Sequence, residues 1–175
     1  MISLAREDVC PGTPCSPWPE TRAKPFRKLG TLRSMKWRKA TEADVPLLAD
    51  LNRQLSEDDG TSALRPAVNF EERLRARLGG GYSAALFELD ETPVAYVLWR
   101  DNEGRGIYVR QFFVARDRRR QGLGRRAFDL LLHEILPPDT AITLEVGEQN
   151  PAGLAFWQAL GFAVFAKAMF RAGSK

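Results

Sequence analysis

A short segment rich in arginine and glycine, residues 116–126, is the part of the chain whose residue types are best suited to chemistry. It holds six arginines and one aspartate, and it contains Gly122 and Gly124. An apolar, strand-like run ending at Val114 precedes it, and a helical apolar pattern follows it. A strand, a glycine turn and a helix N-terminus in this order point unpaired backbone N–H groups at one spot, where the helix dipole favours an anion. The segment therefore predicts a phosphate-binding loop.

The glycines and arginines of this loop support phosphate binding in different ways. Glycine has no Cβ, so Gly122 and Gly124 let the backbone approach a ligand closely. Arginine presents forked donors that match phosphate oxygens. The segment contains neither the Gly-Lys-Ser/Thr of a Walker loop nor the three glycines of a dinucleotide fingerprint, so ATP hydrolysis and hydride transfer lack support. A solvated arginine-rich turn is the alternative interpretation.

The charge distribution also favours a small anionic ligand. The 175 residues carry a net charge of +4, of which residues 1–34 contribute +3. The rest of the chain is nearly neutral, so residues 116–126 form a cationic segment on an otherwise acidic body. One such segment suits a local anion better than the length of a nucleic acid.

Cysteine and histidine usage excludes several kinds of active site. Both cysteines, Cys10 and Cys15, lie in the first 34 residues, and His133 is the only histidine. The body of the chain therefore has no disulfide framework, no cysteine nucleophile and no residues for a cysteine-ligated zinc. We expect no metal site.

Hydrophobic periodicity indicates the elements that must position the loop. A first helix should start at Thr41–Asp44 and end in the acidic loop Glu57–Gly60. The predicted strands are Lys36–Lys39, Ser83–Leu89, Val94–Arg100, Ile107–Val114, Ala141–Val146 and Phe162–Phe170. The other predicted helices are Phe70–Leu78, Gly122–Leu136 and Pro151–Leu160. This order predicts an α/β (α+β) fold with a mixed, mostly antiparallel central sheet and helices on both faces. Ligands of such sheets bind where the strand order changes, here after Val114.

The first 34 residues differ from the rest of the chain in composition. They are rich in proline and show no strand or helix periodicity, which predicts a disordered N-terminal extension. Foldable pattern begins at Met35, so this methionine is a candidate for the true start, with a linker or targeting tail as the alternative. We expect one domain over residues 35–175, no signal peptide and no membrane span.

Two motif blocks stand out within residues 35–171. The first is Arg119-x-x-Gly122-x-Gly124. The second holds Leu144-Glu145-Val146, Asn150, Gly153, Phe156-Trp157 and Gly161-Phe162. Together they resemble the GNAT superfamily of N-acetyltransferases, in which the first block is similar to the acetyl-CoA signature and the second follows at the expected separation. Two blocks in the right order are far more specific than either alone.

The resemblance implies the GNAT acyl-CoA acyltransferase fold and acetyl-CoA as cofactor. In such enzymes the strand ending at Val114 splays from its neighbour, the pantetheine arm enters between them, and loop amides hold the pyrophosphate. The cofactor-binding residues implied in this way are Phe113, Val114, Arg118, Arg119, Arg120, Gln121, Gly122, Leu123, Gly124, Arg125, Asn150 and Phe156. Asn150 is also a candidate N-cap of the helix that begins at Pro151, and Phe156 a candidate core aromatic.

The resemblance also implies a general base. The chain departs from the family at the tyrosine that acts as general acid, which puts that catalytic role in doubt here. Glu145 matches a base position and lies in an apolar strand, where it should be half-buried, although a solvent-facing strand glutamate is the alternative. Trp157 stands where most members have tyrosine, and indole has an N–H donor but no proton to release near neutral pH. Acidic residues of the first helix exit would attract a cationic amine, namely Glu57, Asp58 and Asp59.

The function expected from the sequence is acetyl-CoA-dependent N-acetyl transfer to a primary amine, by direct transfer in a ternary complex. The acceptor would be a small-molecule or peptide amine and the enzyme cytoplasmic, with no nucleic-acid or membrane partner and with a homodimer as one possible state. A catalytically silent acyl-CoA sensor is the alternative that Trp157 suggests. A basic nucleic-acid-binding module built on residues 116–126 is a weaker one.

Overall fold

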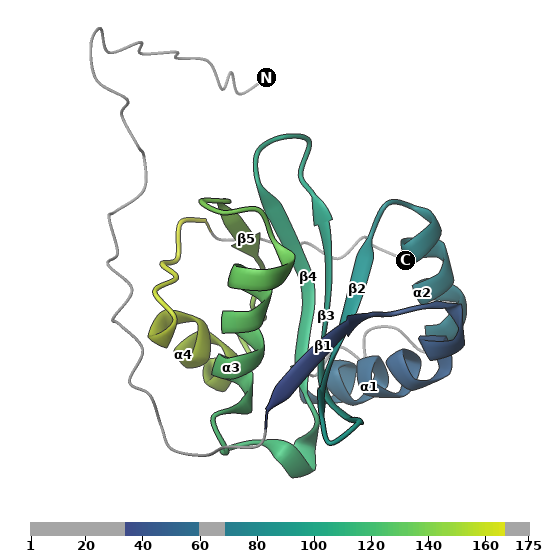
Figure 1. Cartoon of the computed structure of the whole chain (residues 1–175). Helices are drawn as coiled ribbons and strands as arrows, with labels where there is room; N and C mark the ends of the chain where they lie inside the picture. Colours follow the sequence, from purple (N-terminus) through teal and green to yellow (C-terminus); the bar gives the residue numbers. More distant parts are fainter. Residues whose placement is uncertain (1–33, 60–68, 167–175) are drawn as a thin grey trace, which may run out of the picture.

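The computed structural model describes residues 34–59 and 69–166 of the chain, so nearly all of the predicted N-terminal extension lies outside it. The elements follow one another as predicted up to α4 (Figure 1). The strands are β1 (Met35–Lys39), β2 (Ser83–Leu89), β3 (Thr92–Asp101), β4 (Ile107–Val114) and β5 (Ile142–Leu144). The helices are α1 (Val45–Asp58), α2 (Phe70–Gly79), α3 (Leu123–Leu130) and α4 (Pro151–Ala159), with the 3₁₀ turns η1 (Glu42–Asp44) and η3 (Arg116–Arg118) and the π-helix η4 (Leu131–Ile135).

The five strands form one mixed sheet in the order β1-β2-β3-β4-β5. The pairs β1–β2, β2–β3 and β3–β4 are antiparallel, and β5 runs parallel to β4. A register shift in the β3–β4 ladder pairs Leu98 with Gln111 and Trp99 with Val109, which leaves Arg110 as an extra, bulged residue of β4. The β4–β5 ladder ends just before this bulge, at the pair Val109–Leu144. Bulges bend the strand that carries them, so β4 leaves β5 at this point.

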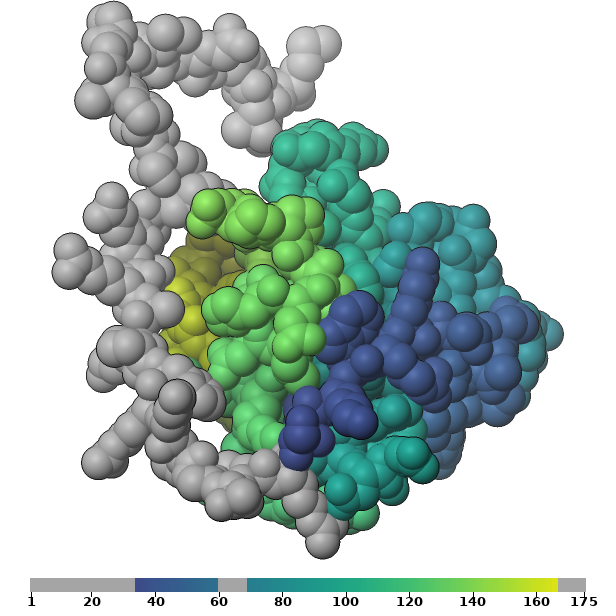
Figure 2. Space-filling model, viewed as in Figure 1, coloured from purple at the N-terminus to yellow at the C-terminus, as the bar shows by residue number. Residues whose placement is uncertain are grey.

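Helices cover both faces of the sheet, which confirms the predicted layers (Figure 1). On one face Leu123, Ala127 and Phe128 of α3 pack with Trp157 of α4 against the sheet. On the other face Val45 and Leu48 of α1 pack with Leu74 of α2 and with Tyr96 of β3. Figure 2 shows α3 (green) beside β1 (purple) on the face turned to the viewer.

The start of the first helix follows its sequence signal. The Asp44 carboxylate accepts hydrogen bonds from the backbone N–H of Thr41 at 2.8 Å and from its hydroxyl at 3.0 Å. Arg38 of β1 donates to both oxygens of the same carboxylate, at 2.8 Å and 2.7 Å. One buried aspartate therefore ties β1 to the entrance of α1.

Two predicted strands and one predicted loop were wrong in extent. Ala141–Val146 contracts to β5, because the ladder stops where β4 and β5 part. The described part of Phe162–Phe170, residues 162–166, forms no strand; the Phe162 N–H instead bonds the Trp157 carbonyl at 3.1 Å and closes α4, with Gly161 at φ 95°. The remainder of that strand lies outside the described residues. Glu57 and Asp58 belong to the last turn of α1 rather than to a loop.

Candidate functional site

Gly122 begins α3 in a conformation that leaves the first helical amides open to a ligand. It is the N-cap residue, with φ 74° and ψ 2°, a left-handed backbone that favours glycine. No side chain caps this helix end, and a Cβ built on Gly122 would meet no atom within 4 Å. The first N–H groups of α3 therefore have no side-chain cap, the arrangement that binds an anion.

Gly124 has a packing role that the sequence did not indicate. A Cβ at this position would lie 3.1 Å from Cε2 of Phe156 and 3.4 Å from Cγ2 of Val114. Gly124 thus lets the first turn of α3 lie against α4 and the end of β4. The main role of the missing side chain is to allow this close approach of α3, α4 and β4.

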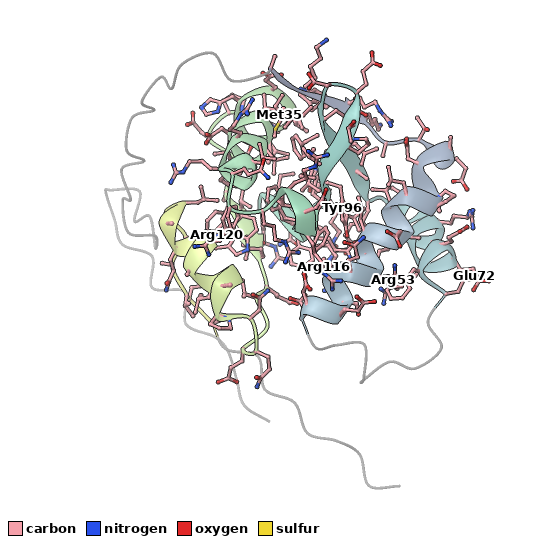
Figure 3. The ribbon with its side chains drawn as sticks, turned by 90° about the horizontal axis from the view of Figure 1, so that it is seen from below. Met35, Arg53, Glu72, Tyr96, Arg116 and Arg120 are labelled. Atoms are coloured by element: carbon pink, nitrogen blue, oxygen red, sulfur yellow. The ribbon has the colours of Figure 1, made fainter. Side chains whose placement is uncertain are left out.

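Two loop arginines are held by the exit of α1 (Figure 3). Arg116 donates to carboxylate oxygens of Glu57 at 2.9 Å and of Asp58 at 2.7 Å, and it is labelled beside α1 in Figure 3. Arg119 pairs with the same Asp58, donates from Nε to the Val114 carbonyl oxygen at 3.0 Å, and lies over the Phe113 ring at 4.8 Å. Burial alone would raise the pKa of Asp58, but its bonds from the two arginines outweigh burial and hold that pKa below its ordinary value.

The other loop side chains are less constrained. Arg125 donates to the Ala159 carbonyl oxygen at 2.8 Å, so this side chain anchors α3 to the end of α4. Arg118 pairs with Asp117 at 3.1 Å. Arg120 is exposed and makes no hydrogen bond or ion pair with the described residues, and its φ of 63° is unusual for a residue with a side chain. Gln121 is exposed and Leu123 is buried in the core.

A pocket opens where β4 and β5 separate. Its lining begins at the last ladder pair, Val109 and Leu144, and continues along the two diverging segments. Asp59 at the exit of α1 and Asn150 at the start of α4 also line it. The lining residues that carry polar side chains are Asp59, Arg110, Gln111, Glu145 and Asn150, and Trp157 adds an aromatic wall. Two residues predicted for catalysis, one for the acceptor and one for the cofactor arm thus come together.

Glu145 does not have the environment that the sequence predicted. Its side chain is 72% exposed, and its carboxylate lies 3.5 Å from Nη1 of Arg110. Because β5 ends at Leu144, Glu145 is outside the sheet and is not half-buried as expected. It borders the pocket as a solvated, ion-paired group.

Asp59 is the more enclosed carboxylate of the pocket. Nδ2 of Asn150 donates to Asp59 Oδ1 at 2.8 Å. Burial raises the pKa of Asp59 above its ordinary value, the Asn150 hydrogen bond lowers it, and the nearby charge of Asp58 raises it further. Asn150 is also the predicted N-cap of α4, because its Oδ1 accepts from the Gly153 N–H at 2.7 Å. One asparagine therefore orients Asp59 and starts α4.

Trp157 belongs to an aromatic cluster beside the pocket. It is 8% exposed, and its ring centroid lies 5.0 Å from that of Phe156 and 5.4 Å from that of Phe112. Phe112 also stacks on Phe156 at 5.8 Å, with 18° between the planes. These rings pack α4 onto the β4 segment that borders the pocket. The two predicted site residues among them, Phe156 and Trp157, therefore have a structural role.

Sequence reasoning missed two pocket residues of β4, Arg110 and Gln111. Gln111 is 8% exposed, donates from Nε2 to Asn52 Oδ1 at 2.6 Å, and accepts from the Tyr96 hydroxyl at 3.3 Å. The signal was present, since two adjacent polar residues inside an apolar strand are unusual and accompany the bulge. No sequence signal indicated which face of the sheet each of these two side chains takes, because the bulge sets that direction.

Two classes of feature are absent from the described part of the chain. Residues 34–59 and 69–166 contain no cluster of three histidine, cysteine or acidic residues that could hold a metal ion. Among the same residues, no helix is long and apolar enough to cross a membrane.

The fold is shared with solved acetyltransferase structures. A ribosomal-protein-alanine N-acetyltransferase from Brucella melitensis biovar Abortus 2308 superposes with a TM-score of 0.61 at 16% identity, covering 79% of this chain and 99% of that one. An aminoglycoside N-acetyltransferase in complex with CoA gives a TM-score of 0.59 at 12% identity, with 83% and 99% covered. An acetyltransferase from Clostridium acetobutylicum, solved with acetyl-CoA, gives 0.56 at 16% identity, with 79% and 96% covered.

Comparison at the sequence level identifies the family. The model of the acetyltransferase (GNAT) family matches residues 46–162, and a search of curated proteins found no match. The chain therefore belongs to the GNAT acetyltransferase family, and the resemblance of its two motif blocks is confirmed.

Proposed function

We propose that this protein is an N-acetyltransferase that moves the acetyl group of acetyl-CoA directly to a primary amine in a ternary complex. Acetyl-CoA is the cosubstrate of the GNAT family to which the chain belongs. The observation that carries the proposal is the junction after β4. There β4 joins two features: it parts from β5 at its bulge, Arg110, and after its last residue, Val114, the chain leads through the loop to the uncapped start of α3.

The residues present fit the cosubstrate in charge and in shape. Unpaired amides at Gly122 and beyond, with the exposed arginines Arg118 and Arg120, would hold the phosphates. Among the residues that the structure describes, no strand pairs with β4 on the β5 side between its bulge and Val114, so this backbone would pair with an extended arm. Acetyl-CoA supplies an activated thioester carbonyl, and this chain must orient an amine and hold its proton.

The acceptor side of the pocket is negatively charged. Asp59, Glu145 and Arg110 line the pocket, a net of one negative charge, so a cationic amine would be attracted there. Glu57 and Asp58, also predicted for the acceptor, are occupied by Arg116 and Arg119 and act chiefly on the loop. The acceptor is therefore expected to meet Asp59 and Glu145 first.

The test is acetyl transfer with the full chain. Acetyl-CoA is offered with a panel of primary amines that spans polyamines, amino acids, aminoglycosides and peptide N-termini, and released coenzyme A thiol is followed. We expect transfer to at least one cationic amine above the uncatalysed rate. Tight acetyl-CoA binding without transfer to any amine would favour the silent sensor that Trp157 suggests.

A further inference from the structure

Two carboxylates line the pocket, and their surroundings differ. Glu145 is mostly solvated and shares its charge with Arg110 at 3.5 Å. Asp59 is half-buried, and the hydrogen bond that reaches its carboxylate comes from the neutral Asn150 at 2.8 Å. A carboxylate already paired with a guanidinium is a weak proton acceptor, whereas one enclosed without a cationic partner accepts a proton more readily.

Resting on the proposed function, we propose that Asp59 is the general base of the reaction and that Asn150 positions it. Asp59 lines the same pocket as the bulged residue Arg110, at the point where the β4–β5 ladder ends. Asn150 holds the Asp59 carboxylate through Nδ2 and is itself fixed by the start of α4, through its bond from Gly153. The base is therefore tied to the element that borders the cosubstrate path.

The proton balance of the step is complete with these groups. Asp59 takes one proton from the acceptor ammonium, which frees the nitrogen lone pair. That nitrogen forms the new C–N bond to the thioester carbonyl carbon as the C–S bond breaks, and sulfur keeps the electron pair. The second proton of the nitrogen ends on the sulfur, and Asp59 returns its proton to water. No metal or redox partner is needed.

The charged and titratable groups around Asp59 agree with this role. Asp58, next in the chain, adds negative charge that favours the protonated form of Asp59. On the sheet side lie the buried hydroxyl of Tyr96, which stays neutral because burial raises its pKa, and the Arg110–Glu145 pair across the pocket. Burial, first, and then the charge of Asp58 raise the pKa of Asp59 above its ordinary value, which favours proton uptake.

The experiment compares three variants of the full chain, Asp59→Asn, Glu145→Gln and Asp50→Asn. Asn at position 59 keeps an oxygen for the Asn150 bond and loses only the base. Asp50 is an exposed aspartate of the same helix, bonded to Arg53 and Gln54 and outside the pocket, and serves as the matched control. Acetyl-CoA affinity, measured by calorimetry, should be the same in all four proteins.

The basicity of the acceptor amine distinguishes a catalytic base from a residue that has only a structural role. With a strongly basic amine, Asp59→Asn should lower kcat/KM by roughly 10²- to 10⁴-fold and remove the acidic limb of its pH profile. Glu145→Gln should lose less, and Asp50→Asn should match wild type. With a weakly basic amine that is already neutral at the assay pH, the Asp59→Asn loss should shrink. A loss equal for both amines, or a wild-type rate in Asp59→Asn, would overturn the assignment while leaving the acetyltransferase function intact.

A second measurement needs no turnover. Carbon-13 NMR of the carboxyl groups in the free protein, with Asp59→Asn used for assignment, reports where Asp59 titrates. We expect titration clearly above the ordinary aspartate value of about 3.9. Titration at or below that value would contradict the assignment even if no acceptor had been found, whereas failure of the proposed function would show as the absence of transfer by the wild-type chain.

Discussion

The Arg119 guanidinium donates from Nε to the carbonyl oxygen of Val114 at 3.0 Å, so the loop after β4 is tied back to the last residue of that strand. The same side chain reaches Asp58 at the end of α1. Through these contacts Arg119 joins the loop, the sheet and the exit of α1. Its contacts define the shape of the loop before any phosphate is bound.

Replacing Arg119 and its neighbour Arg120 should separate loop shape from loop charge. Arg119→Ala removes the contacts to Val114 and Asp58, so we expect lower thermal stability and weaker acetyl-CoA binding. Arg120→Ala removes an equal charge from an exposed side chain that makes no hydrogen bond or ion pair with the described residues, so the melting temperature should hold while affinity falls modestly, and less so at high salt. Calorimetry and thermal unfolding of both variants provide the measurement, and equal melting temperatures would argue against the anchoring role of Arg119.

Gly122 should be required for acetyl-CoA binding for two separable reasons. Gly122→Ala must adopt a left-handed backbone at a cost of roughly 1–2 kcal/mol, yet its Cβ meets open space. Gly122→Asp adds a negative charge beside the phosphates. We expect the alanine variant to bind acetyl-CoA more weakly and the aspartate variant not measurably, while both fold. Undiminished affinity in Gly122→Asp, measured by calorimetry, would remove this loop from the cofactor site.

Trp157 should tolerate tyrosine and not alanine. Trp157→Ala leaves a hole between Phe112, Phe128 and Phe156, and the loss of a large buried aromatic costs about 3–5 kcal/mol. Trp157→Tyr keeps a ring and offers the hydroxyl that most family members have, so turnover should hold or rise. Denaturant unfolding and the acetylation rate provide the readouts. A tyrosine variant that folds but has lost its activity would show that the indole itself is needed.

The stability of the chain should fall in acid partly through Asp44. Hydrogen bonds from Arg38, foremost, and from Thr41 hold the pKa of Asp44 below its ordinary value despite burial. A depressed folded-state pKa means that the ionised carboxylate stabilises the fold above the unfolded pKa of about 3.9, and that this contribution is lost as the pH falls through the lower folded value. Asp44→Asn should therefore be destabilised at pH 7, with the difference from wild type shrinking at pH 3. A difference that does not depend on pH, measured in urea, would contradict it.

The contribution of Asp59 to the pH dependence of stability should have the opposite sign. Its folded pKa is raised, so folding disfavours its ionised form and the associated cost is present above that pKa. Asp59→Asn should then be at least as stable as wild type at pH 8, although it is slower as an enzyme. A large loss of stability at that pH, measured by thermal unfolding, would mean that the carboxylate serves the fold.

Sequence patterns alone determined the element order, the two helical layers and the family of this protein. Two local signals carried the family: the glycine and arginine spacing around Gly122, and the block from Leu144 to Phe162. Local signals can be recognised without knowledge of the fold. The strand predicted from Phe162 failed over its described residues because an alternating apolar run needs a partner strand, and the Phe162 N–H was already used to close α4.

Only the tertiary structure decided which of the two pocket carboxylates is enclosed and which is solvated. Sequence patterns favoured Glu145 as the base, because it matches a base position and lies in an apolar run, whereas Asp59 was predicted only to attract the acceptor amine. Their difference comes from long-range contacts, because Arg110 reaches Glu145 across 35 positions and Asn150 reaches Asp59 across 91. Burial and charge partners brought together by folding set proton affinity, and the one-residue bulge at Arg110 opened the space between β4 and β5 in which that difference matters.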